Sequence, residues 1–99
     1  MEHLIKDGDS KKKNVVRSID LAKTALNIDL KDGESWYVLG NAYMFNFFVN
    51  MTLITELHNA LKAYNQAEAN LMKSNPDLHY NRANVFKINL SEKKKNLEI

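Results

Sequence analysis

The chain of 99 residues contains no cysteine, one proline and three glycines. The lack of cysteine excludes disulfides, thiol nucleophiles and zinc sites built from cysteine. The sequence also has no amino-terminal apolar stretch long enough for a signal peptide, and no run approaching the roughly 20 apolar residues that cross a bilayer. We therefore expect a protein without a membrane span that works in the cytoplasm, in the nucleus or in both.

Signatures of catalysis are also scarce. The three glycines form no phosphate-cradling loop, and no nucleophile elbow occurs. The histidines, His3, His58 and His79, are scattered, and none has a second ligand or an acid at the spacing of a zinc site. The sequence therefore predicts a protein that is not an enzyme and that binds no cofactor and no metal.

Charge of one sign does not dominate, since 14 lysines and arginines face 12 acidic residues and leave a net charge of +2. Basic residues gather in two short runs, 11–13 and 93–95, which we expect to be solvated. Both runs lack the interleaved aromatic side chains that stack on bases. Direct contact with nucleic acid is therefore not expected, although a ribosome or RNA contact through these lysines stays an alternative.

The most informative pattern that is present runs from Trp36 to Tyr43. Trp36, Leu39, Gly40 and Tyr43 lie at i, i+3, i+4 and i+7, so they share one face of a helix. Gly40 leaves a gap beside the bulky indole, where another helix can approach closely. This combination is typical of the first helix of a tetratricopeptide repeat (TPR).

Related patterns flank this helix on both sides. Small, large and small residues at i, i+4 and i+7 follow as Ala60, Tyr64 and Ala67, as expected of the second helix of the repeat. A similar triplet begins upstream at Ser18, and the first-helix spacing begins again at His79. The chain thus holds parts of three repeats. The side chains expected to pack the repeats together are Ala22, Ala25, Trp36, Leu39, Gly40, Tyr43, Ala60, Tyr64, Ala67, His79, Ala83 and Phe86.

These patterns predict an all-α fold, a TPR helix-turn-helix array that forms an α-solenoid fragment of about two to two and a half repeats. We expect helices near residues 15–28, 33–47, 55–72, 76–88 and 91–97. The expected organisation is a polar amino-terminal tail (1–13) and a TPR segment (14–99), which divides into the second helix of one repeat (15–28), a full repeat (33–72) and an incomplete repeat (76–99).

The central repeat is longer than the family norm. Trp36 and His79 are 43 residues apart, whereas TPR units repeat about every 34 residues. Most of the excess lies in an interhelical insertion at 44–57, which is too apolar for an ordinary solvent loop. Its large apolar side chains are expected in the core, with self-association as the alternative; they are Phe45, Phe47, Phe48 and Met51.

Beside the packing residues runs a second stripe, which is repeated in both first helices. Tyrosine supplies rigid contact area, and an asparagine amide offers both a donor and an acceptor to the backbone of a bound peptide. First helices line the concave groove of a TPR array, so these residues are candidates for partner binding, with ordinary interhelical packing as the alternative. They are Tyr37, Asn41, Met44, Tyr80, Asn84 and Lys87.

The runs 35–43, 60–68 and 74–83, together with the long insertion, resemble the middle repeats of one TPR subfamily. The similarity spans residues 18–86. The resemblance implies a non-catalytic scaffold that binds a peptide or a partner protein, either in transcription-cofactor assemblies or in the recognition of nascent tubulin. The competing hypothesis is a structural module that forms a homo-oligomer through the apolar insertion.

Overall fold

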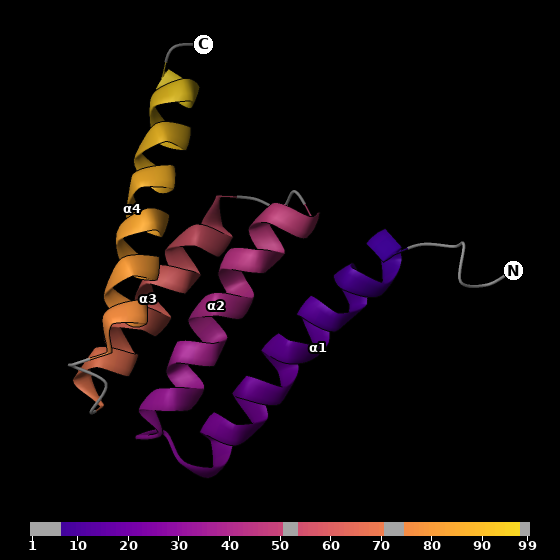
Figure 1. The fold of residues 1–99 in the computed structure, drawn as a ribbon, viewed down its shortest axis with the longest axis vertical. Helices are drawn as coiled ribbons and strands as arrows, with labels where there is room; N and C mark the ends of the chain where they lie inside the picture. The colour runs from indigo at the N-terminus through magenta and orange to yellow at the C-terminus, as the bar shows by residue number, and fades with distance from the viewer. Residues whose placement is uncertain (1–6, 51–53, 71–74, 98–99) are drawn as a thin grey trace, which may run out of the picture.

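Four helices follow one another in antiparallel order in the computed structural model, which describes residues 7–50, 54–70 and 75–97 (Figure 1). Each helix packs on the one before it, and α2 also contacts α4. The predicted all-α class is confirmed, and the arrangement is consistent with two TPR helix-turn-helix units. The helices are α1 (Asp7–Ile28), α2 (Gly33–Asn50), α3 (Thr55–Ala69) and α4 (Pro76–Leu97).

Several helix bounds differ from those expected. Helix α1 begins at Asp7, so residues 7–13 of the predicted polar tail are helical, because lysine is a good helix former. Helix α2 continues to Asn50, and α3 ends at Ala69. The predicted break between 88 and 91 is wrong, because no proline or glycine interrupts α4 there.

Both first helices start at a residue with a short amide or carboxylate side chain. Asp32 Oδ1 accepts hydrogen bonds from the backbone N–H groups of Glu34 and Ser35, at 3.1 and 3.2 Å. Asn75 Oδ1 accepts from those of Asp77 and Leu78, at 2.8 and 3.2 Å. These bonds satisfy donors that the helix itself leaves unpaired. The same device therefore sets the start of α2 and of α4.

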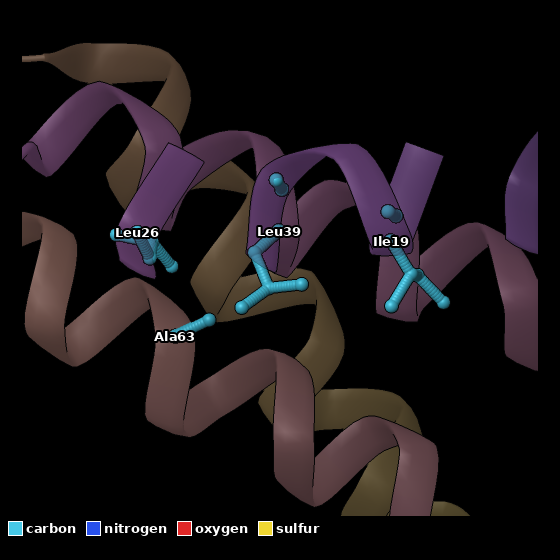
Figure 2. Close-up of a cluster of buried hydrophobic side chains, with 6 residues drawn as sticks. Ile19, Leu26, Leu39 and Ala63 are labelled. Atoms are coloured by element: carbon cyan, nitrogen blue, oxygen red, sulfur yellow. The ribbon is translucent and has the colours of Figure 1, made fainter. Parts of the chain in front are cut away.

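The core consists of two clusters that meet at α3. Ile19 and Leu26 of α1 pack with Leu39 of α2, and Ala63 of α3 joins this cluster (Figure 2). The second cluster surrounds Tyr64, which is fully buried, and includes side chains of α2, α3 and α4. Since α2 and α3 both contribute side chains to the two clusters, this central pair of helices holds the array together.

Gly40 explains how α2 and α3 come so close. A Cβ atom at this position would lie 2.6 Å from Cε1 of the Tyr64 ring, which is too close for any real contact. Gly40 is buried, and because it has no side chain, the ring of Tyr64 fits against its backbone. The glycine of the first-helix pattern therefore lets α2 and α3 approach each other closely.

Two negative findings apply to the described ranges. No helix in them is both long and apolar enough to cross a membrane. No group of three or more histidine and acidic side chains gathers there in a way that would hold a metal ion.

Candidate partner-binding surface

The two predicted stripes differ in how they meet solvent. On α2, Tyr37 and Met44 are half-buried, because both pack against the cluster around Tyr64. On α4, Tyr80 has 68% of its surface exposed, and Lys87 is also exposed. The stripe on α4 is thus the one that offers free side-chain surface.

Asn41 joins three helices. Its Oδ1 atom accepts a hydrogen bond of 2.6 Å from the hydroxyl of Tyr64 on α3 and one of 3.1 Å from Nδ2 of Asn81 on α4. Asn81 Nδ2 also donates to the Tyr37 hydroxyl at 3.4 Å. The carbonyl of Asn41 is therefore engaged within the fold, and its bonds fix α4 beside α2.

Burial supports this arrangement electrostatically. Loss of solvent around the Tyr64 hydroxyl raises the pKa of Tyr64 well above its usual value, and the nearby Tyr37 raises it further. The two rings lie 6.1 Å apart between centroids. Tyr64 consequently stays neutral at any ordinary pH and keeps the proton that it donates to Asn41.

Sequence reasoning missed Asn81 as a member of this network. Asn81 follows Tyr80 directly, in the run that carries the resemblance at 74–83. Its role depends on a contact with α2 across 40 residues of chain, and no local spacing encodes such a contact. The signal that was available is a polar residue beside the repeated stripe, on the side that faces the previous repeat.

Most of the residues expected to pack the repeats together are buried or half-buried. Those on α4 behave differently: Ala83 and Phe86 are exposed, because no described helix lies over this side of α4. The packing expected of these two is therefore absent. The other packing residues are buried (Ala22, Leu39, Gly40, Ala60, Tyr64, Ala67) or half-buried (Ala25, Trp36, Tyr43, His79).

The apolar insertion is divided between core and surface. Phe47 packs against the cluster around Tyr64 and meets Phe48 edge to face, at 5.4 Å between ring centroids. Phe45 and Phe48 are themselves exposed. Met51 lies outside the described residues.

A charged cluster joins α3 and α4 at the side of α4 that is left uncovered. Arg82 Nη1 donates to Glu68 Oε1 at 2.9 Å and to Asn65 Oδ1 at 3.1 Å. Arg82 Nη2 lies 3.1 Å from His79 Nδ1. The arginine thus bridges the two helices in a place where solvent still reaches it.

The two lysine runs lie on helices and not in unstructured tails. Residues 11–13 belong to α1 and 93–95 to α4, and all six side chains are exposed. They stand on the two outer helices of the array (Figure 1).

Comparison with known proteins places this geometry in a family context. No protein-family model matches the chain. Tetratricopeptide repeat protein 5 of Bos taurus is 44% identical over 82 residues, that of Mus musculus 45% over 82, and that of Homo sapiens 43% over 81. These matches cover 80 or 81% of this chain but only 18 or 19% of each relative's length. The chain is therefore homologous to a segment of tetratricopeptide repeat protein 5.

Proposed function

We propose that the chain is a non-catalytic protein-interaction module that binds an extended peptide or a partner segment along the face shared by α2 and α4. Homology to a TPR protein supports protein partners in general. Within this face, Tyr80, Asn84 and Lys87 make the direct contacts. Tyr37 and Asn41 act behind them, as the residues that hold α4 in place.

The observation that carries this proposal is the exposure of Tyr80. Tyr80 leaves 68% of its surface in water, and in a complex this surface offers rigid contact area at low entropic cost. Asn84 and Lys87 follow at i+4 and i+7, so they lie on the same side of α4. Together they present an aromatic ring, an amide and a positive charge to one ligand.

This set of groups suits an extended peptide. The Asn84 amide has a donor and an acceptor, as a peptide backbone requires, and Lys87 favours an acidic side chain nearby. Following the resemblance, we propose that the partner belongs either to a transcription-cofactor assembly or to nascent tubulin. A peptide copied from the amino terminus of tubulin is the first probe.

The test is a fluorescence anisotropy titration of this labelled peptide with the chain and its variants. Tyr80→Ala should weaken binding about tenfold or more, as expected for an aromatic anchor. Phe86→Ala is the matched control, because Phe86 is another exposed aromatic of α4 that lies six residues away and points to a different side. Equal affinities for the wild type and Tyr80→Ala would refute the assignment of this face.

A further inference from the structure

Among the described residues, one hollow lies between α3 and α4 and another between α1 and α2. The α3/α4 hollow is lined by Leu61, Asn65, His79, Arg82, Ala83 and Phe86. The α1/α2 hollow is lined by residues that include Ser18, Leu21, Ala25 and Val38. Helices α1 and α4 stand at opposite edges of the array, so the outermost helix of each edge borders one hollow (Figure 1).

The second helix pair repeats the first in sequence. Residues of α1 correspond to residues of α3 that lie 42 positions later, so that Ala22 matches Tyr64. Residues of α2 correspond to residues of α4 that lie 43 positions later, so that Gly40 matches Ala83 and Tyr43 matches Phe86. Each hollow can therefore be compared with the equivalent surface of the other pair.

The equivalent of the α3/α4 hollow is a surface that α3 covers. Leu61 and Arg82 match Ile19 and Leu39, which are both buried in one cluster with Ala63 of α3. Ala83 matches Gly40, against which the ring of Tyr64 lies. The α3/α4 hollow is thus shaped to bind a further helix that packs on α3 and α4 as α3 packs on α1 and α2.

The equivalent of the α1/α2 hollow is a surface that α2 covers. Ser18 and Ala25 match Ala60 and Ala67, which are fully buried. Tyr43 and other side chains of α2 pack against this cluster. The α1/α2 hollow is thus shaped to bind a further helix that packs on α1 and α2 as α2 packs on α3 and α4.

We propose that a second copy of the chain fills both hollows through one head-to-tail contact. Helix α1 is the counterpart of α3, so α1 of one copy fits the α3/α4 hollow of its neighbour. Helix α4 of that neighbour, the counterpart of α2, then lies in the α1/α2 hollow of the first copy. The contact is heterologous, because its two surfaces differ. An assembly of any number of copies therefore keeps one free hollow at each of its two ends, and it can grow further.

Ala83, one of the residues that line the α3/α4 hollow, favours α1 as the occupant. Tyr64 requires glycine opposite, because a Cβ atom at Gly40 would lie 2.6 Å from its ring. Ala83 carries that Cβ atom, so a helix with an aromatic side chain at this point would not fit. Helix α1 has Ala22 at the position of Tyr64, and two alanines can face each other at the same helix separation.

Exposed apolar side chains border both hollows and would be covered by the contact. Leu21 on α1 is 60% exposed, and Phe86 on α4 is 54% exposed. Leu21 matches Ala63, which lies over Leu39, so Leu21 of one copy would lie over Arg82 of the other. Removing this apolar surface from water favours association.

The test is sedimentation velocity of the 99-residue chain over a concentration series that reaches roughly 1 mM, where weak association is detected. The wild type should form a series of growing species. Phe86→Lys and Leu21→Lys should each be monomeric, because one places a charge in an apolar contact and the other places it beside Arg82. Both residues are exposed, so helical content measured by circular dichroism should not change.

Mixing the two variants gives the sharpest outcome. Each variant keeps one intact surface, so an equimolar mixture should form a 1:1 dimer that cannot grow. Phe48→Lys is the control, because Phe48 is an exposed apolar residue outside both hollows, and this variant should assemble as the wild type does. A monomeric wild type, a mixture that stays monomeric, or loss of assembly in Phe48→Lys alone would each overturn the proposal.

Discussion

The two helix pairs of this chain, α1/α2 and α3/α4, carry different side chains at equivalent packing positions. Between α1 and α2, Leu26 and Leu39 are buried together and meet Ala63 of α3 (Figure 2). At the corresponding positions, α3 and α4 carry Glu68 and Arg82, which form an ion pair of 2.9 Å. A third helix, α3, covers the first layer, whereas no helix in the described ranges covers the second.

The difference shows that the side chains of a layer match whether a described helix covers it. A leucine layer gains stability only if another helix excludes water from it, and α3 does so for the first pair. The side chains of Arg82 and Glu68 keep 24 and 38% of their surface exposed, so their charges remain hydrated without a cover. The open pair therefore depends for its stability on its other side, where Leu78 and Val85 are fully buried and Asn81 reaches Asn41.

The largest expected effect comes from breaking the covered layer. Leu39→Ala should lower the free energy of unfolding by about 2–5 kcal/mol, because it leaves a cavity between three helices. The matched change in the open layer, Arg82→Ala, should cost no more than about 1 kcal/mol, because the ion pair that it removes is partly exposed. Urea unfolding followed by circular dichroism measures both. Similar losses of unfolding free energy in the two variants would mean that the two layers contribute equally to the stability of the fold.

A smaller effect should separate the two asparagines of the repeated stripe. Asn41→Ala leaves the buried Tyr64 hydroxyl without its acceptor and should destabilise the chain by about 1–3 kcal/mol. Asn84→Ala, the equivalent change on α4, should alter stability by less than about 0.5 kcal/mol but should weaken peptide binding. Urea unfolding and peptide titration of both variants test this division of roles. Loss of stability in Asn84→Ala with unchanged binding would reverse it.

Sequence periodicity predicted the part of this architecture that depends on neighbours along one helix. Gly40 and Tyr64 were identified because each belongs to a pattern with residues three and four positions away. The Asn41–Asn81 bond and the Arg82–Glu68 pair were not predicted, since each joins different helices and depends on their exact separation. The uncovered state of Ala83 and Phe86 was missed for the same reason: spacing identifies a packing face but does not show whether another helix covers it.

The smallest effect concerns the two helix starts, where Asp32 and Asn75 hold corresponding positions. Hydrogen bonds from the Ser35 side chain and then from the Ser35 backbone lower the pKa of Asp32 below its usual value near 3.8. A carboxyl with a lowered pKa in the folded state contributes stability that is present above its unfolded pKa and is lost as the pH falls through the folded pKa. Unfolding should therefore become easier below about pH 4 through the cap of α2, whereas the amide cap of α4 does not titrate.

Asp32→Asn isolates this contribution, because it gives α2 the kind of cap that α4 already has. The variant should lose part of the acid sensitivity of the wild type while it keeps a capping side chain at the start of α2. Thermal unfolding between pH 3 and pH 7 measures the difference between the two proteins. Other carboxyl groups titrate in both, so the quantity that matters is the gap between the two curves, which should narrow as the pH falls below about 4. A gap that stays constant over this range would show that the charge on Asp32 adds nothing to the cap, and that the two helix starts are equivalent in energy as well as in geometry.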